Sequence, residues 1–380
     1  MKILLINQEF PPMEGGAGNA AWFLSRELAL RGHRLHVITA LQPSASAPLE
    51  GVQVTRVPVA GWRGGAFPLR ALRAFASAAF PAAMATEPPD VTLAFFGWPG
   101  GGVARRLRRA RGTPYVIALR GSDVPGFRLP MIHPISLLAR PLLRGIWREA
   151  GAVVANSESL RALARRTWSG RVDVIPNGVD TQAFAPGATV TDRPFTALTV
   201  SQLVPRKRID LLLEAWARFR RVASGDVRLR VIGRGREESS LRALADRLGV
   251  AESVEWRGTV GRDDMPAEYR AADAFVLLSR QEGMSNALLE AMASGLPCIS
   301  TPVGDAGTWF ADGRCGVRVE PDADAVCAAL QSLATDAARR RRLGDSARAY
   351  VTQHASWASV AVAYETLLAR AVQSAGGCQV

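Results

Sequence analysis

The chain contains 380 residues, of which 48% are hydrophobic and 21% are charged. It is therefore long enough for two α/β domains and too apolar for a disordered protein. Its Lys and Arg residues number 47 against 34 acidic residues, a net charge of +13, and every one except Lys2 and Lys207 is an arginine. Such a charge suggests nucleic acid, an anionic membrane or a phosphorylated substrate as a partner, although an arginine preference on solvated helix faces explains it equally well.

The cysteines argue against a zinc-binding protein and against a disulfide-bonded one. Cys298, Cys315, Cys327 and Cys378 form no C-x-x-C pair, which argues against a zinc site and a disulfide framework and favours a reducing, cytoplasmic compartment. The apolar stretch at the N-terminus is too short for a signal peptide, and no run of about 18 apolar residues predicts a membrane-spanning helix. Peripheral contact with a membrane stays open.

The first half of the chain alternates strand-like and helix-like segments. A short strand, Lys2–Asn7, leads into a loop rich in Pro and Gly, and the helix that follows ends at Gly32. Further strands are expected at Leu35–Thr39, Val52–Val59, Val91–Phe96, Tyr115–Leu119, Val153–Ala155 and Val172–Pro176. This alternation predicts a parallel sheet with helices on both faces.

A linker-like stretch, Asp180–Pro194, separates this pattern from a second one of the same kind. The expected strands are Thr196–Val200, Arg228–Ile232, Val254–Trp256, Ala274–Leu278 and Cys298–Ser300, and the expected helices are Asp210–Arg221, Glu237–Leu248, Pro266–Ala272, Ser285–Ser294 and three more over residues 324–371. Two Rossmann-like lobes with a cleft between them are the simplest interpretation. Open parallel sheets bind ligands at the carboxyl ends of their strands.

The segment from Gln281 to Gly295 follows a predicted strand and carries two glutamates, Glu282 and Glu290. Ser285 is a good N-cap, which places Asn286 and Glu290 on one helical face. The backbone N–H groups near the helix start can bind a phosphate, and the two carboxylates can each hold vicinal hydroxyls. An acidic loop followed by a surface glutamate is the plainer explanation.

Three cations, Arg206, Lys207 and Arg208, lie between the first strand and the first helix of the second lobe. Lysine offers a point charge and arginine a fork, so together they can hold a diphosphate. A lysine retained in a chain that otherwise uses arginine indicates a geometric requirement. A solvated helix start is the alternative.

Other features carry weaker signals. Gly15 and Gly16 follow the first strand and let the backbone approach an anion. Arg120 and Asp123 also follow a strand, where a cation and a carboxylate can face the cleft or form an Asx turn. The aromatic segment Phe95–Gly101 is a candidate sugar platform, but strand-end packing explains it better.

The spacing of Asp322 and Asp324 would suit a metal diphosphate, but helix capping is the better interpretation because these residues open a helix. The run Arg339–Arg342 is interpreted as a solvated helix face.

Taken in order, these segments resemble those of retaining glycosyltransferases with the GT-B fold, specifically glycosyltransferase family 4. The likeness spans nearly the whole chain through Pro11–Gly18, Ile175–Asp180, Val204–Lys207, Val231–Gly235, the glutamate pair of Glu282–Glu290, and Thr301–Gly304. It implies an α/β protein of two Rossmann-like lobes facing a central cleft. Residues 1–184 would bind the acceptor, completed by a C-terminal helix at about residues 356–380 that crosses back, and residues 185–355 would bind the nucleotide sugar.

The resemblance implies roles for individual residues. Glu282 would contact the donor sugar near the reacting carbon, and Glu290 would hold the ribose hydroxyls. Arg206 and Lys207 would neutralise the diphosphate leaving group, so no metal or other cofactor would be required. Further donor contacts would come from Gly16, Gly283, Met284, Ser285 and Asn286, and acceptor-side contacts from Gly15, Arg120 and Asp123.

Two positions depart from the family pattern. Arg120 stands where relatives often have a histidine, and a guanidinium cannot act as a general base at neutral pH. Its expected role is to hold a donor phosphate or an anionic acceptor. Gln202 stands where many relatives have an arginine, which leaves more of the diphosphate charge to Arg206 and Lys207.

The resemblance therefore implies transfer of a hexose-type sugar from a nucleotide diphosphate sugar to an acceptor hydroxyl, with retention, in polysaccharide, glycolipid or other glycoconjugate biosynthesis. The expected acceptor is a saccharide or a lipid-linked saccharide, and nucleic acid is not an expected partner. One alternative is a non-catalytic nucleic-acid-binding protein, but the basic residues are not interleaved with aromatics. Another is an NAD-dependent oxidoreductase, but the first lobe lacks the G-x-G-x-x-G motif with its downstream acidic residue.

The positive charge concentrates in the first lobe. Residues 103–150 hold ten arginines against Asp123 and Glu149, a local balance of 10 − 2 = +8. An anionic membrane surface is therefore a candidate partner of this lobe, on the inner face of the plasma membrane.

Overall fold

The computed structural model describes residues 1–11, 16–41, 49–60, 62, 67–127, 132–187 and 193–376, and it forms two compact units. The first unit comprises Met1–Gly178 and Trp357–Val380, and the second comprises Val179–Ser356. Phe184 packs in the core of the second unit, so the first unit ends earlier than residue 184, where the sequence placed the boundary.

The described part of the first unit contains a seven-stranded parallel sheet in the order β3-β2-β1-β4-β5-β6-β7. Its strands are β1 (Lys2–Ile6), β2 (Arg34–Ala40), β3 (Val52–Val57), β4 (Val91–Phe95), β5 (Tyr115–Leu119), β6 (Ala152–Ala155) and β7 (Val172–Val174). Every residue of β4 and β5 is buried. Such continuous apolar runs belong to parallel strands that are covered on both faces.

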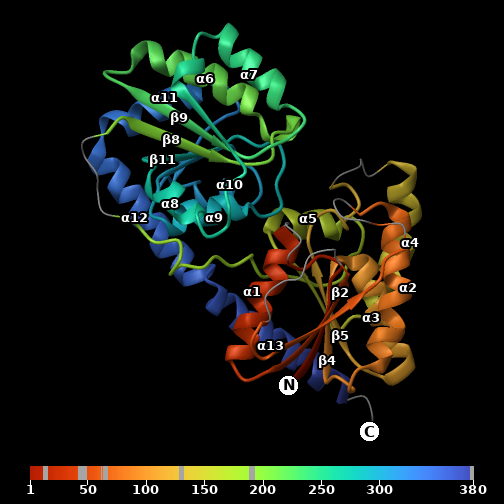
Figure 1. The fold of residues 1–380 in the computed structure, drawn as a ribbon. Helices are drawn as coiled ribbons and strands as arrows, with labels where there is room; N and C mark the ends of the chain where they lie inside the picture. Colours follow the sequence, from red (N-terminus) through yellow and green to blue (C-terminus); the bar gives the residue numbers. More distant parts are fainter. Residues whose placement is uncertain are drawn as a thin grey trace. The chain divides into compact units, whose positions relative to one another are not determined.

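Helices cover both faces of this sheet (Figure 1). They are α1 (Gly16–Leu30), α2 (Leu69–Ala85), α3 (Gly101–Arg111), α4 (Pro134–Glu149), α5 (Glu158–Arg165) and α13 (Trp357–Gly376). The irregular segment η1 (Phe96–Gly100) joins β4 to α3, and its Trp98 has extended backbone with φ −150° and ψ 137°. α1 and α13 share an apolar core with one face, and α2, α3 and α4 pack on the other.

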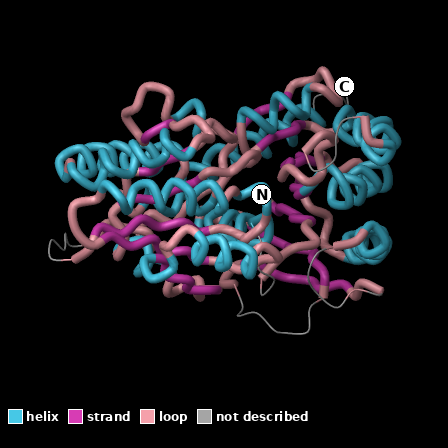
Figure 2. The backbone as a smooth tube through the Cα atoms, turned by 90° about the horizontal axis from the view of Figure 1, so that it is seen from above, coloured by secondary structure: helices cyan, strands magenta, loops and turns pink. Residues whose placement is uncertain are grey.

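The second unit contains a parallel sheet in the order β10-β9-β8-β11-β12-β13. Its strands are β8 (Phe195–Val200), β9 (Val227–Ile232), β10 (Val254–Gly258), β11 (Ala274–Leu277), β12 (Cys298–Ser300) and β13 (Val317–Arg318). Figure 2 distinguishes the helices and strands of the chain by colour.

The helices of the second unit also divide between the two faces. They are α6 (Ile209–Val222), α7 (Glu238–Arg247), α8 (Met265–Arg270), α9 (Asn286–Ala293), α10 (Ala306–Trp309), α11 (Ala323–Thr335) and α12 (Ala337–His354), with 3-10 turns η2 (Pro205–Lys207) and η3 (Ala251–Ser253). α6, α7 and α11 pack on one face, and α8, α9, α10 and α12 pack on the other.

The last helix, α13, belongs to the first unit although it follows the second in sequence. The Trp357 ring stacks on Phe23 of α1 with ring centroids 5.2 Å apart. A Cβ atom at Gly178 would lie 2.3 Å from Trp357, so only glycine allows the chain to pass this ring. The apolar face expected on this helix is confirmed by the burial of Val360, Tyr364, Leu367 and Leu368.

The alternation predicted from the sequence is confirmed, and the strands differ mainly at their ends. The two-residue strand β13 was not predicted. Asp322 caps α11 by accepting hydrogen bonds from the N–H groups of Asp324 and Ala325, both at 3.0 Å, which confirms the capping interpretation. Among the described residues, no helix is both long enough and apolar enough to cross a bilayer.

Candidate functional site

Lys207 and Glu282 form an ion pair at the carboxyl edge of the second sheet. β8 leads into η2, which ends at Lys207, and β11 leads into the loop that carries Glu282. Because β8 and β11 are adjacent parallel strands, their carboxyl ends bring these loops together. Nζ of Lys207 donates to Oε1 of Glu282, and the two side chains are only 11% and 10% exposed.

Other groups converge on the same carboxylate oxygen. The Ser279 hydroxyl donates to Oε1 of Glu282 at 2.7 Å, and a guanidinium nitrogen of Arg206 lies 3.5 Å from it. Burial lowers the pKa of the Lys207 ammonium, and the Glu282 charge opposes that shift. Because these contacts all reach Oε1, Oε2 can accept a hydrogen bond from a ligand hydroxyl.

The loop that carries Glu282 is supported from behind by the Thr301–Gly304 segment. The Thr301 hydroxyl donates to the Ser279 carbonyl at 2.9 Å. Gly304 has a φ of +54°, and a Cβ atom there would lie 2.6 Å from the Gly283 carbonyl oxygen. The glycine thus permits close approach of two backbone segments, and this segment of the sequence motif positions Glu282.

Helix α9 begins next to this loop. The Ser285 hydroxyl accepts a hydrogen bond from the Leu288 N–H at 3.3 Å, which confirms the predicted N-cap. Gly283 is buried, and Met284, Ser285 and Asn286 are partly exposed. The positive end of the helix dipole therefore lies in the chain segment that carries Glu282, a placement that suits a phosphate.

Glu290, one turn into α9, is held by Tyr269 of α8. The Tyr269 hydroxyl donates to Oε2 of Glu290 at 2.8 Å, and it lies 3.2 Å from the Ala287 carbonyl. Burial raises the pKa of Glu290 to about 7, while the Tyr269 hydrogen bond and the charge of Arg262 oppose that rise. Sequence reasoning missed Tyr269 because the contact arises from the packing of two helices.

Gly233 and Gly235 follow β9 and pack against the chain after β8. Cβ atoms at these positions would lie 1.8 Å from the Ser201 carbonyl oxygen and 2.1 Å from that of Leu203. The Leu203 N–H donates to the Arg234 carbonyl at 2.9 Å. Close backbone packing is therefore sufficient to explain why both positions are glycine, whether or not a ligand binds there.

In the first unit, Gly16 is the first residue of α1 and is exposed. Gly15 lies outside the described residues. Asn7, at the carboxyl end of β1, donates through its side-chain amide to the carbonyls of Glu9 at 2.5 Å and Ala17 at 3.3 Å. These contacts tie the end of the strand to the start of the helix.

The Arg120 guanidinium is held by three groups of the first unit. It donates to the Asn177 side chain at 2.7 Å and to the Tyr364 hydroxyl at 3.2 Å, and it lies 3.7 Å from the centroid of the Phe95 ring. Phe95 and Phe96 are buried, so the packing interpretation of this aromatic segment is confirmed. Sequence reasoning missed Asn177 and Tyr364 as partners of Arg120.

Asp123 folds back onto the backbone. Its carboxylate accepts hydrogen bonds from the N–H groups of Gly97 at 2.6 Å and Arg120 at 3.0 Å. Burial raises the pKa of Asp123 against these hydrogen bonds. The carboxylate thus connects the end of β5 to η1, which is the turn-forming alternative expected from the sequence.

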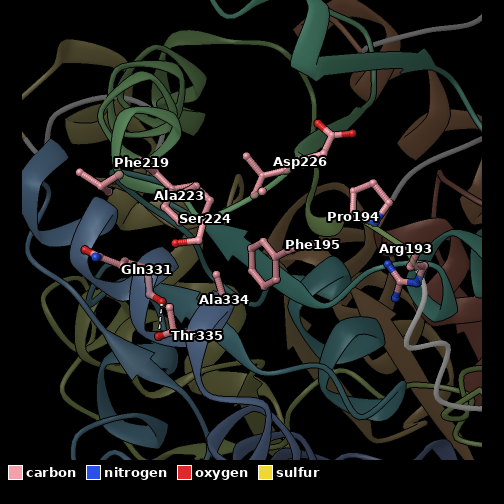
Figure 3. A pocket seen from close by; sticks show the side chains of 13 residues that line it. Arg193, Pro194, Phe195, Phe219, Ala223, Ser224, Asp226, Gln331, Ala334 and Thr335 are labelled. Atoms are coloured by element: carbon pink, nitrogen blue, oxygen red, sulfur yellow. Dashed lines mark hydrogen bonds between the residues drawn. The ribbon is translucent and has the colours of Figure 1, made fainter.

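A pocket of about 460 Å³ lies elsewhere, at the amino ends of β8 and β9 (Figure 3). Its lining includes Arg193, Phe195, Asp226 and Gln331, and it contains none of the residues predicted to bind the donor or the acceptor. Among the residues that the structure describes, no three His, Cys, Asp or Glu side chains gather where they could hold a metal ion.

Comparison with known families matches both units. Residues 14–183 match the model described as Glycosyltransferase Family 4, and residues 194–336 match Glycosyl transferases group 1. The chain belongs to glycosyltransferase family 4. This family 4 chain is therefore an enzyme that transfers a glycosyl group, a class different from a nucleic-acid-binding protein or an NAD-dependent oxidoreductase.

Two curated relatives align with the family 4 chain over most of both lengths. A GDP-mannose-dependent alpha-(1-6)-phosphatidylinositol monomannoside mannosyltransferase from Mycolicibacterium smegmatis is 28% identical, covering 93% of this chain and 95% of the relative. A D-inositol 3-phosphate glycosyltransferase from Stackebrandtia nassauensis is also 28% identical, covering 91% and 86%.

Solved structures place the family 4 chain in the GT-B fold. Sucrose-phosphate synthase from Thermosynechococcus elongatus has a TM-score of 0.84 at 22% identity, covering 98% of this chain and 100% of that one. Anabaena HepE, solved with UDP and glucose, has a TM-score of 0.75 at 18% identity, covering 97% and 99%.

Proposed function

We propose that this glycosyltransferase moves a hexose from a nucleoside diphosphate sugar to an acceptor hydroxyl, with retention of anomeric configuration, during glycoconjugate assembly. The observation that carries the proposal is the convergence of Lys207, Arg206 and Glu282 at the carboxyl edge of the second sheet. In open α/β sheets ligands bind outside this edge. The nearby start of α9 adds a helix N-terminus suited to phosphate.

Lys207 and Arg206 neutralise the charge that develops on the departing diphosphate. An ammonium has three donors, so Lys207 can keep one on Glu282 and direct another to a phosphate oxygen. Arg206 is 48% exposed and can turn its fork toward the same anion. Stabilising this developing charge is the protein's largest task in such a reaction, and these groups perform it without a metal.

The two glutamates hold the sugar and the ribose. Oε2 of Glu282 accepts a hydroxyl of the donor hexose, and Oε1 of Glu290, the oxygen that Tyr269 does not contact, accepts a ribose hydroxyl. Gly283, Met284, Ser285 and Asn286 lie along the donor between them. Two carboxylates on one loop-and-helix segment thus set the donor's direction.

In the reaction, the acceptor oxygen attacks the anomeric carbon from the face that the diphosphate leaves. The bond from that carbon to the diphosphate oxygen breaks, the new glycosidic bond forms, and a phosphate oxygen takes the acceptor proton. This front-face route gives retention. It follows from the family resemblance, and it places no general base at Arg120, which could not serve as one.

The first unit provides the acceptor side. We assign Gly16, the first residue of α1, to the acceptor side, together with Gly15. We assign Arg120 and Asp123 to positioning of the carboxyl edge of the first sheet. Asn177 and Tyr364 already hold the Arg120 guanidinium, and backbone N–H groups already hold the Asp123 carboxylate.

A lipid-linked saccharide is the acceptor class we favour. The mycobacterial relative acts, by its name, on a phosphatidylinositol mannoside and uses GDP-mannose. A chain of this kind would work on the cytoplasmic face of the plasma membrane as a peripheral protein. The excess of arginine in residues 103–150 supports contact with an anionic surface.

The test is a panel of GDP- and UDP-hexoses measured by thermal stabilisation and donor hydrolysis, followed by NMR of the anomeric configuration of the product. A donor that binds the folded protein raises the midpoint of unfolding. We expect one nucleotide class to stabilise the wild type and to lose that effect in Lys207→Ala and Glu290→Ala. Unchanged kcat/KM in both variants contradicts the site assignment, and an inverted product contradicts retention.

A further inference from the structure

One segment of the first unit exposes an unusual number of large aliphatic side chains. The described residues contain ten exposed large hydrophobic side chains, and five of them lie in α4 and the residues before it. They are Ile132 (83% exposed), Ile135 (57%), Leu137 (47%), Leu138 (80%) and Leu142 (48%). α4 packs against α3 and is labelled at the right of Figure 1. Scattered exposed leucines are ordinary, but a contiguous group marks an interaction surface.

α4 has two distinct faces. Leu143, Ile146 and Trp147 are buried against the sheet, whereas Ile135, Leu138 and Leu142 recur at helical spacing on the face that solvent reaches. The buried face accounts for the folding of the helix. The exposed apolar side chains do not pack in the core, so they are available to contact a binding partner.

The charge around this surface has one sign. No acidic residue occurs between Asp123 and Glu149, a stretch that contains Arg140, Arg144 and Arg148. Glu149 is itself paired with Arg105 at 2.5 Å and Arg109 at 2.7 Å. On the neighbouring helix α3, the exposed arginines Arg106 and Arg108 add to the excess.

We propose that these five aliphatic side chains, with Arg144 and Arg148, form a docking surface for an anionic lipid bilayer, called here the α4 surface. Aliphatic side chains enter the acyl boundary while arginines at the polar side contact lipid phosphates. The surface carries no tyrosine or tryptophan, the side chains that usually anchor protein partners. A symmetric pairing of two copies would also place arginine against arginine.

The position of the α4 surface suits the proposed acceptor. β5 ends at Leu119, and the chain then passes Arg120 before entering α4 at Pro134. The apolar half of α4 is therefore its first half, which starts from the carboxyl edge of the first sheet. Docking there would bring the edge that carries Arg120 and the start of α1 to the lipid headgroups. The inference extends the proposed use of a lipid-linked acceptor.

The test is co-sedimentation with vesicles of phosphatidylglycerol and phosphatidylcholine, without donor or acceptor. The variant Ile135→Gln/Leu138→Gln/Leu142→Gln removes the apolar face, and Leu30→Gln, at a leucine 74% exposed on α1, is the matched control. We expect the triple variant to lose at least about tenfold in vesicle affinity and the control to bind as the wild type does. Binding should weaken with salt and with vesicles of phosphatidylcholine alone.

Two variants check the charge and the fold. Arg148→Gln, which removes an exposed charge of the α4 surface, should weaken binding to anionic vesicles without affecting thermal stability. Nucleotide binding by the triple variant should equal that of the wild type, so a failure of vesicle binding is distinguishable from a failure of the proposed sugar transfer. The inference is overturned if the wild type does not bind anionic vesicles, or if the triple variant binds them as well as Leu30→Gln does. It is also overturned if analytical ultracentrifugation shows that the wild type is a dimer and the triple variant a monomer.

Discussion

The hydroxyl of Tyr269 donates a 2.8 Å hydrogen bond to Oε2 of Glu290, so a buried phenol fixes the carboxylate that we assign to the ribose. The bond leaves Oε1 for the ligand. It also favours the charged carboxylate, yet burial prevails and raises the pKa of Glu290 to about 7. Nucleotide binding should therefore depend on pH in the neutral range.

The first prediction concerns this pH dependence. Ribose hydroxyls donate to the ionised carboxylate, so binding favours the charged form and releases a proton. Since the pKa of Glu290 lies at about 7 without ligand, affinity for the nucleoside diphosphate should rise about tenfold from about pH 6 to about pH 8. Isothermal titration calorimetry in buffers of different ionisation enthalpy measures both the affinity and the released proton. Glu290→Gln should bind weakly and lose the dependence; a wild type with flat affinity over this range contradicts the prediction.

The same group has a consequence for stability. The pKa of Glu290 is raised above its unfolded value of 4.5, so the folded state binds the proton more tightly and loses stability as pH rises through about 7. Glu290→Gln never ionises. Its unfolding midpoint without ligand should therefore exceed that of the wild type at about pH 8, and the difference should shrink toward about pH 5. Thermal denaturation at both pH values measures this, and a variant less stable at the higher pH would refute it.

The Lys207–Glu282 pair allows structural and functional roles to be separated. Removing one member of a buried pair costs about 3–5 kcal/mol, so Lys207→Met should lower the free energy of unfolding by about 3 kcal/mol. The double variant Lys207→Met/Glu282→Gln leaves no unpaired charge and should recover most of that loss. Both should lose about a hundredfold or more in kcat/KM for donor turnover.

Arg206→Gln is the comparison for that pair. Arg206 is 48% exposed, so its loss should change stability by less than about 0.5 kcal/mol while still lowering donor turnover. Urea denaturation and donor hydrolysis give the two readouts. A double variant that turned over donor at the wild-type rate would show that the pair has only a structural role.

Gly304→Ala tests the support behind Glu282. A Cβ atom at Gly304 would lie 2.6 Å from the Gly283 carbonyl oxygen, whereas Gly313, with a similarly positive φ of +68°, has no atom within 4 Å. Both alanines carry the backbone strain of about 1–2 kcal/mol, but only Gly304→Ala displaces the loop. We expect donor turnover to fall in Gly304→Ala and to be preserved in Gly313→Ala. Equal turnover in the two variants would remove the positioning role of Gly304.

Arg120→Met tests whether Arg120 acts through the fold. The change removes hydrogen bonds to Asn177 and Tyr364 and the stacking on Phe95, so the free energy of unfolding should fall by about 1–3 kcal/mol. Arg108→Met, at an exposed arginine, should have little effect. If Arg120→Met left stability unchanged and abolished transfer, Arg120 would instead contact the substrate directly.

The local pattern of the sequence was sufficient for most of the fold. Tyr115–Leu119 was predicted as a strand with the bounds it has, because all five residues are buried and read as one apolar run. β13 was missed because its two residues, Val317 and Arg318, contain no recognisable pattern. The N-caps at Ser285 and Asp322 could be predicted because capping depends on neighbours in the chain.

The sequence was sufficient to name candidate site residues but not to predict which residues they contact. Lys207, Glu282 and Glu290 could be named as candidates, but their partners could not. Ser279 and Tyr269 reach these glutamates through the meeting of strand ends and the packing of α8 on α9, which no local spacing encodes. Gly233 and Gly235 lie in the segment Val231–Gly235, which carried part of the family resemblance, and the structure adds that close packing against Ser201 and Leu203 requires both glycines.

Because the chain uses arginine in place of most lysines, an amine-specific reagent can be used to label Lys207 in the candidate site. Apart from Lys2 and the N-terminus, Lys207 is the one primary amine in the sequence, and burial lowers its pKa. A lysine with a lowered pKa is a better nucleophile at neutral pH. Acylation followed by peptide mass spectrometry would therefore report on Lys207 against only two other amines, Lys2 and the N-terminus. A bound diphosphate would protect it, so the labelling rate measures occupancy without knowledge of the acceptor.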